Sequence, residues 1–156
     1  MGLYGALVVN GPGHTAAAPV AYAGIGYQAA ALVLFSEIDV VQNNAVDALA
    51  AAGPIDPAAY PSTIDYRPTY FLINGTAYDK TSPPPPVSAG LPGNNVLLRF
   101  LNAGLHSHTP APVGLEMKLV AEDGNPYPGL PRRQNAALLA AGKTLDALVT
   151  MPAGDA

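Results

Sequence analysis

Short apolar runs alternate with turn-forming residues along the whole chain. Alternation of apolar and polar side chains over about four to eight residues is typical of β-strands that bury one face. The pattern predicts strands at residues 3–9, 31–38, 69–73, 96–101, 117–121, 136–140 and 146–151. Turns are expected at Asn74-Gly75 and Asp123-Gly124, because Asn, Asp and Gly readily adopt the backbone conformations of tight turns. The sequence therefore predicts an all-β sandwich or barrel of antiparallel strands.

One short helix interrupts the strands. Asp39 can accept hydrogen bonds from the first helical N–H groups, the Ala-rich residues 40–52 favour a helix, and Gly53 can end it. Residues 14–26 are rich in Ala, Gly and Pro, which predicts a loop between two structural units. Residues 54–68 contain four prolines, which predicts an irregular crossing of the surface.

The composition excludes several classes of function. Charged residues make up 12% of the chain, the net charge is −4, and Arg132 and Arg133 are the only adjacent basic pair. No nucleic acid partner is therefore expected. The longest apolar stretch, residues 29–35, is much shorter than the ~20 residues of a membrane-spanning helix, so no membrane span is expected. Met1 is followed by no signal-peptide pattern, so we expect either that the chain is cytoplasmic or that its start has been removed.

The chain has no cysteine. Disulfides, thiolate zinc sites and cysteine nucleophiles are therefore excluded. A type 1 copper centre is excluded as well, because its defining ligands are two histidines and a thiolate. Only three histidines, His14, His106 and His108, could offer an imidazole to a metal ion.

Four segments carry a family pattern when they are taken in order. They are GLYGALVV at residues 2–9, DYRPTYFLING at 65–75, VLLRFLNAG at 96–104, and a passage from Met117 through AEDG at 121–124 to AGKTLDALV at 141–149. In this order and spacing they resemble the laccase-like multicopper oxidases, which are built from repeated cupredoxin domains. The resemblance covers almost the whole chain and implies an all-β, cupredoxin-like Greek-key fold.

The resemblance implies that the chain has three parts. Residues 1–13 correspond to the closing strand of a preceding cupredoxin domain, residues 14–30 to a crossing linker, and residues 31–156 to a middle cupredoxin-like domain. In this family the first and last domains bind copper, so the resemblance implies copper in the parent enzyme and none bound by this chain. The flanking copper-bearing domains would be its partners, and the periplasm or the outside of the cell its location.

His106 and His108 are the metal-ligand candidates of this sequence. His106-Ser107-His108 has the HxH spelling of a copper pair, and residues i and i+2 of a strand project to the same side. The resemblance places both in a middle-domain loop, which favours loop histidines without metal over a weak surface site that also uses a carboxylate such as Glu116. His14 is isolated and indicates no site.

Two carboxylates, Glu37 and Asp39, follow each other with strand spacing at the end of the run 31–38. Side chains at this spacing share one face and could form a carboxylate pair or bind a hard cation. A simpler interpretation is that Glu37 marks the end of the strand and Asp39 the start of the helix. No catalytic residue is assigned, because Ser36 has no histidine near it in the sequence and no phosphate-binding loop is present.

Two functions of different classes remain, beside a minor third, a degenerate oxidase in which oligomerisation supplies the missing ligands. The first is a non-catalytic middle domain or fragment of a multicopper oxidase, whose parent would oxidise phenols, dyes or metal ions one electron at a time and reduce dioxygen to water. The alternative is an autonomous all-β interaction or cell-surface module without redox activity. The chain alone is not expected to be active. Because the apolar strand at 2–9 would lack its native partners, a homodimer through this strand is expected.

Overall fold

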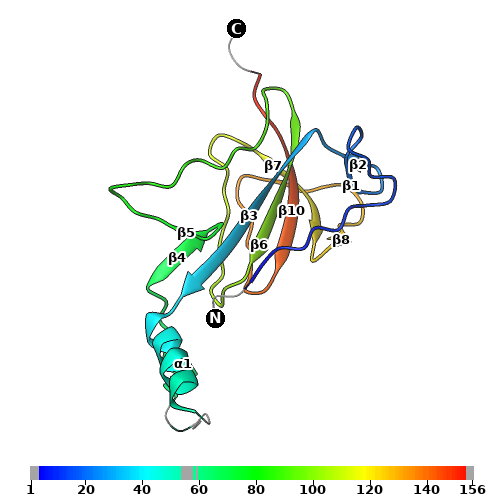
Figure 1. Ribbon diagram of the computed structural model, residues 1–156. Coiled ribbons are helices and arrows are strands. Elements are labelled where there is room, and N and C mark those ends of the chain that lie inside the picture. Colours follow the sequence, from blue (N-terminus) through cyan, green and yellow to red (C-terminus); the bar gives the residue numbers. More distant parts are fainter. Residues whose placement is uncertain (1–3, 54–57, 59, 154–156) are drawn as a thin grey trace.

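Within the residues that the computed structural model describes, 4–53, 58 and 60–153, eight strands join in one sheet and two form a hairpin (Figure 1). The elements are β1 (Val20–Tyr22), β2 (Ile25–Gly26), β3 (Ala29–Ile38), α1 (Val40–Ala52), the 3₁₀ turn η2 (Thr63–Asp65), β4 (Tyr70–Ile73), β5 (Thr76–Ala77), β6 (Asn95–Asn102), β7 (Met117–Glu122), β8 (Asn125–Pro126), β9 (Arg133–Gln134) and β10 (Thr144–Thr150).

The sheet has the strand order β5-β4-β3-β6-β10-β7-β8, with β9 also paired to β7. Every pair of neighbours is antiparallel except β3 and β6, which are parallel. The expectation of an entirely antiparallel sheet was therefore wrong at this pair. Parallel neighbours need a long crossover connection, and here α1, β4 and β5 lie between the two strands in the chain. Local patterns of apolar residues do not reveal such a crossover.

Apolar side chains of β6 alternate between two faces of the sheet, because successive side chains of a strand point in opposite directions. On one face Val96, Leu98 and Phe100 are buried in the main core, whose other members include residues of β7, β10 and the segment around Leu139. On the opposite face Leu97 joins a smaller cluster with residues of the β1–β2 hairpin and of β7. The central strands are therefore covered on both sides.

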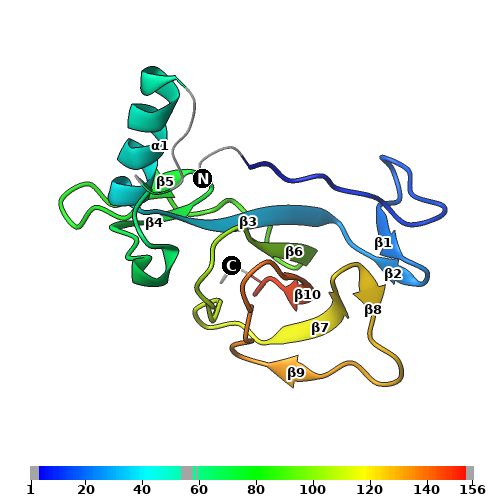
Figure 2. The same ribbon diagram turned by 90° about the horizontal axis from the view of Figure 1, so that it is seen from below.

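Figures 1 and 2 place α1 and the β1–β2 hairpin on opposite sides of the molecule. In the chain, β3 is the first strand of the large sheet, and it is followed by α1. Asp39 caps the helix by accepting hydrogen bonds from Val41 N at 2.9 Å and Gln42 N at 3.1 Å. Gly53 ends it with φ of +102°, a conformation that glycine adopts without steric cost. The helix predicted at 40–52 is confirmed, including its cap.

Most strand predictions are confirmed to within two residues, namely those at 31–38, 69–73, 96–101, 117–121 and 146–151. The strand at 3–9 was wrong for the described part, since residues 4–9 form no regular element, while Leu3 lies outside the described residues. The strand at 136–140 was also wrong, because the segment pairs only through a single bridge between His108 and Leu139.

The loop predicted at 14–26 contains the β1–β2 hairpin instead. Gly24, at φ of +75°, supplies its turn, and the buried Ala21 anchors it to the sheet. These strands are too short to give a period in the sequence. In the irregular crossing predicted at 54–68, η2 is the regular element found, and residues 54–57 and 59 lie outside the described part.

Candidate functional site

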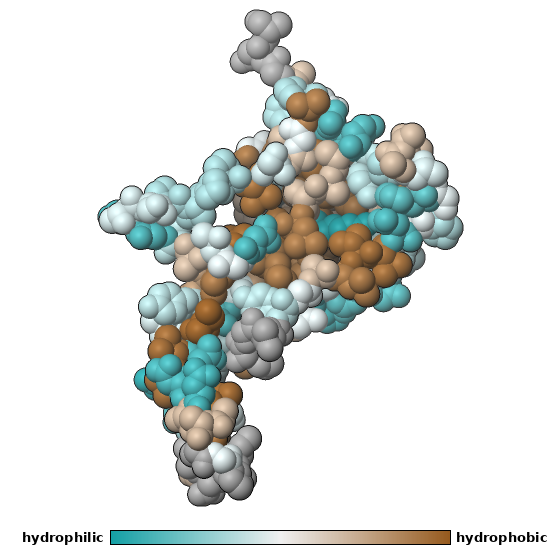
Figure 3. Space-filling model, in the orientation of Figure 1, coloured by the Kyte–Doolittle hydropathy of each residue, from teal (hydrophilic) through white to brown (hydrophobic). Residues whose placement is uncertain are grey.

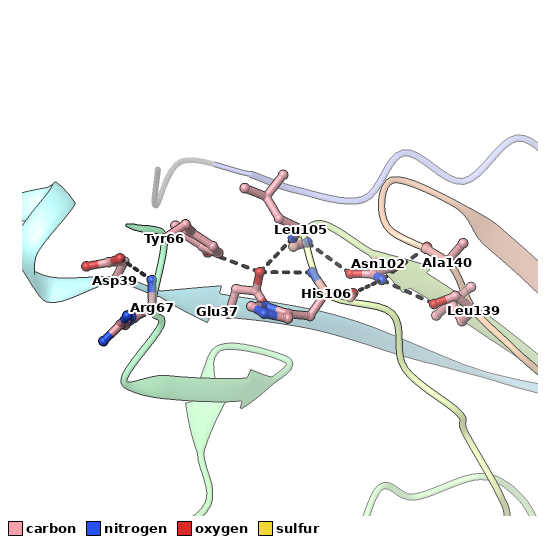
Figure 4. A network of polar contacts seen from close by, with 10 residues as sticks. Glu37, Asp39, Tyr66, Arg67, Asn102, Leu105, His106, Leu139 and Ala140 are labelled. Carbon is pink, nitrogen blue, oxygen red and sulfur yellow. Dashed lines mark hydrogen bonds and ion pairs between the residues drawn. The ribbon is translucent and has the colours of Figure 1, made fainter. Parts of the chain in front are cut away.

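The carboxylate of Glu37 is the centre of a polar network where β3 ends (Figure 4). Its side chain is only 1% exposed. It accepts hydrogen bonds from Tyr66 Oη at 3.0 Å, from Leu105 N at 2.6 Å and from His106 N at 3.1 Å. Its other oxygen lies 3.1 Å from His106 Nδ1. One buried carboxylate thus ties the loop after β6 to β3 and to the segment before β4.

These contacts determine the electrostatics of the network. Burial by itself raises the pKa of Glu37, but the hydrogen bonds from Leu105, His106 and Tyr66 outweigh burial and lower the pKa of the carboxyl below its ordinary value. Burial, and the hydrogen bond to Glu37, raise the pKa of the Tyr66 phenol. Glu37 therefore remains an anion and Tyr66 a neutral donor over the ordinary pH range.

Asn102 extends the network to the segment that precedes β10. Its Nδ2 donates to the carbonyl oxygens of His106 at 2.8 Å, Ala140 at 3.1 Å and Leu139 at 3.3 Å, and its Oδ1 accepts from Gly104 N at 2.9 Å. Gly104 must lack a side chain here, because a Cβ would lie 2.8 Å from Cδ of Glu37. The Asn-Ala-Gly signature is therefore explained by a loop folded closely over a buried carboxylate.

The structure separates the environments of His106 and His108. The His106 ring is about half exposed, bonded to Glu37 and stacked on Tyr66 at 5.8 Å between ring centroids. The His108 ring stacks on Phe35 at 4.8 Å between ring centroids, and its Nε2 is buried with no hydrogen-bond partner in the part of the chain that the structure describes. The HxH argument assumed that His106 and His108 lie in a strand. They do not: the segment 106–108 forms no regular strand, and His108 forms an isolated bridge with Leu139.

The other candidates are held by neighbours of their own. Glu116 pairs with Arg133 at 3.0 Å. His14 Nδ1 lies 3.2 Å from both backbone atoms of Val20, its N–H and its carbonyl. Asp39, besides capping α1, accepts a hydrogen bond from Arg67 N at 2.8 Å.

The donor set does not fit the copper centres that the resemblance implies for a parent enzyme. A type 1 centre needs a thiolate, and the sequence has none. Within the described ranges no three or more His, Cys, Asp or Glu side chains are grouped so that they could hold a metal ion. His106 and His108 therefore stay predictions as metal ligands.

A second polar group lies on the opposite face of the sheet, in a cavity of about 340 Å³. The segment from Leu7 to Gly11 forms one wall, and Tyr22, Arg99 and Asp146 are among the residues opposite. Tyr22 Oη donates to Asp146 Oδ2 at 2.7 Å. Asp146 is 8% exposed, and burial raises its pKa although Tyr22 and the charge of Arg99 act against the rise.

Sequence reasoning missed this group. Its signal was one charged residue inside each of two apolar strands, Arg99 in β6 and Asp146 in β10. The ladder places these two residues directly opposite each other. Which strands are neighbours was not readable from the sequence, so the two positions could not be paired.

Comparison with known proteins gives the family and the fold. The family model "Multicopper oxidase" matches residues 43–156. Among solved structures, "Multicopper Oxidase mgLAC" is 19% identical over 82% of this chain with a TM-score of 0.60. A blue copper oxidase from Nitrosomonas europaea is 17% identical over 82% with a TM-score of 0.58. No curated protein matches the chain.

The described domain is shorter than these structures. The chain covers 35% of each of the two chains just named and 22% of Fet3p, a multicopper oxidase described as functioning in iron import, which has a TM-score of 0.53. At such low identity the likeness shows the fold alone. The prediction of an all-β, cupredoxin-like fold with one short helix is confirmed.

Proposed function

The chain belongs to the multicopper oxidase family, and we propose that it is a non-catalytic, copper-free middle domain of such an oxidase. In this proposal residues 1–13 close a preceding cupredoxin domain, residues 14–30 cross over, and residues 31–156 form the middle domain. The domain spaces and braces two copper-bearing neighbours. The parent enzyme oxidises phenols, dyes or metal ions by single electrons and reduces dioxygen to water.

The distribution of donor groups carries this proposal. The chain has three histidines and no cysteine. His14 is hydrogen-bonded to the backbone of Val20 and His106 to the carboxylate of Glu37, and the His108 ring stacks on Phe35. The electron-accepting and oxygen-reducing centres of the family would therefore have to come from other domains.

The N-terminal segment supports the proposed division of the chain. Residues 4–10 are extended and are donors or acceptors in none of the backbone hydrogen bonds found among the described residues. Leu7 is 87% exposed and Val9 75% exposed. Figure 3 shows apolar surface across the middle of the face on which this segment and β3 run. An unpaired apolar segment of this kind is suited to complete a sheet elsewhere.

The copper content of the purified chain tests the proposal. We expect substoichiometric copper after loading with Cu(II) and dialysis, without the intense blue colour of a copper–thiolate centre and without turnover of a laccase dye. His106→Ala/His108→Ala should retain as little copper as the wild type. Tightly held, stoichiometric copper together with dye turnover would overturn the proposal.

Association with copper-bearing domains separates this function from an autonomous interaction module without redox activity. Co-expression with polypeptides that carry first and last cupredoxin domains should give a complex that co-purifies and binds copper. A chain that stays monomeric beside them would favour the module. By family likeness we place the parent in the periplasm or outside the cell. No helix in the described ranges is long and apolar enough to cross a bilayer.

In the isolated chain the same segment can pair with a second copy, so we propose a homodimer through residues 2–9. Light scattering at high concentration should report the dimer mass. Leu7→Ser/Val9→Ser should shift it to the monomer, because the contact would lose its apolar side chains. Leu130→Ser, at a leucine 93% exposed in another loop, is the matched control.

A further inference from the structure

The cavity under the N-terminal segment has the size of a ligand site. Its volume of about 340 Å³ lies within the range of small-molecule pockets, ~300–1,000 Å³. One wall is mainly apolar, with Leu7, Val8 and Val9, and the other carries charged groups on the sheet. Apolar walls with a few convergent polar groups are typical of binding sites for small molecules.

The two charged side chains of this cavity have unused hydrogen-bonding capacity. Asp146 is more than nine-tenths buried, with 8% exposure, and within the described residues it receives a hydrogen bond at Oδ2 alone, from Tyr22. Arg99 faces it across the ladder, yet none of the ion pairs of the described residues joins the two. Arg99 Nη2 is buried, with no hydrogen-bond partner among the described residues.

Such groups are costly in a folded protein. Buried polar atoms are nearly always hydrogen-bonded, and an unpaired buried charge is more unfavourable still. Here a carboxylate oxygen needs a donor and a guanidinium group needs an acceptor, at neighbouring positions of one cavity. A ligand that offers both at once would satisfy the two together.

The charges decide what kind of ligand fits. An anion would be attracted by Arg99 but repelled by Asp146, and a cation the reverse, so their opposite charges favour a neutral ligand. We propose that this cavity binds a neutral secondary amide, whose N–H donates to Asp146 and whose carbonyl accepts from Arg99, with a small aliphatic body against Val8. All these residues belong to this chain, so the site can be tested on the chain by itself.

Three probes of nearly equal size test the chemistry on the 156-residue chain. They are N-methylacetamide, N,N-dimethylacetamide, which lacks the N–H, and acetate, which carries a negative charge. NMR titration at about pH 8, well above the ordinary carboxyl range, should show saturable shifts at Tyr22, Arg99 and Asp146 with N-methylacetamide. Dimethylacetamide should bind about tenfold more weakly, because it loses one hydrogen bond to a charged group. Acetate should not bind. Equal response to all three probes, or no saturable response, would overturn the proposal.

Two variants assign the roles. Asp146→Asn replaces an acceptor with a group that can donate, so the preference for N-methylacetamide over dimethylacetamide should vanish or reverse. Arg99→Met should weaken binding of both amides about tenfold. Arg133→Met, at an exposed arginine paired with Glu116, is the matched control and should bind as the wild type does. If a variant fails to fold, the three-probe series on the wild type still decides.

The amide can come from a free small molecule or from a polypeptide backbone. N-acetyl-leucine N-methylamide represents the first source and the peptide acetyl-Ala-Ala-Leu-Ala-Ala-amide the second. Binding of the small compound alone assigns a small-molecule site. Binding of the peptide at least about tenfold more tightly, with the same dependence on Asp146, assigns a backbone segment. Failure of both amides would overturn the proposal and leave the copper and association tests unaffected.

Discussion

Two carboxylates buried in this domain have opposite surroundings. Glu37, 5% exposed, receives hydrogen bonds from two backbone N–H groups, a phenol and an imidazole. Asp146, 8% exposed, receives one, from Tyr22. Burial acts on both in the same direction, but the pKa of Glu37 is lowered and that of Asp146 raised. The number of donors, and not the depth of burial, separates a carboxylate that fastens the fold from one that is open to a ligand.

Removing the acceptor at Glu37 should have the largest effect. Glu37→Leu would leave the N–H groups of Leu105 and His106 and the Tyr66 hydroxyl without their acceptor. Because each unsatisfied buried group costs about 1–3 kcal/mol, the free energy of unfolding should fall by about 3 kcal/mol or more. Urea denaturation measures the loss. Glu37→Gln keeps one carbonyl acceptor and should lose less; equal losses would show that the donors do not matter.

Crowding the same carboxylate should come next. Gly104→Ala would place a Cβ 2.8 Å from Cδ of Glu37, and the hydrogen bonds on that carboxylate resist its displacement. Overpacking of this kind costs about 1–3 kcal/mol. The thermal midpoint should fall clearly. Gly5→Ala is the control, since a Cβ at Gly5 would meet nothing within 4 Å.

Neutralising Asp146 should have a smaller effect of the opposite sign. Asp146→Asn removes a buried charge that has a single donor, Tyr22, so near pH 7 the variant should be as stable as the wild type or more stable by up to about 1 kcal/mol. A loss as large as that of Glu37→Leu, measured by the same urea denaturation, would erase the contrast between the two carboxylates.

The pH dependence of stability should also differ in sign. For Asp146 the folded pKa is raised, so from the ordinary carboxyl pKa up to the raised one the folded state holds more protons, and stability falls as pH rises. For Glu37 the folded pKa is lowered, so its contribution is present above the ordinary pKa and is lost as pH falls through the lowered one. Urea titrations of wild type, Asp146→Asn and Glu37→Gln from about pH 3 to 7 separate the two trends.

An exposed carboxylate provides the baseline for this comparison. Asp123 pairs with Lys143 at the turn after β7, and the lysine side chain is 43% exposed. Exposed pairs are weak and are screened by salt. Lys143→Met should leave the urea midpoint unchanged within error, and raising the salt concentration should remove any residual difference. A marked loss would show that an exposed carboxylate stabilises the fold as strongly as a buried one, contrary to what we expect.

The local signals in the sequence were reliable where one segment decides its own structure. Asp39 and Gly53 bounded α1, and Asn74-Gly75 ended β4, because caps and turns depend on a few neighbouring residues. Only part of the candidate site could be predicted from the sequence. Glu37 and His106 were both singled out, but as possible metal ligands; their contact with each other across 69 positions of sequence was not foreseen.

Composition by itself determined that this chain offers no thiolate to copper, and apolar periodicity determined most of its strands, because neither depends on what lies nearby in space. The tertiary structure alone decided that β3 runs parallel to β6, that residues 4–9 form no regular element, and that Arg99 lies beside Asp146 on one wall of a cavity. These features arise from contacts between distant segments, and no local pattern of side chains encodes which segments meet.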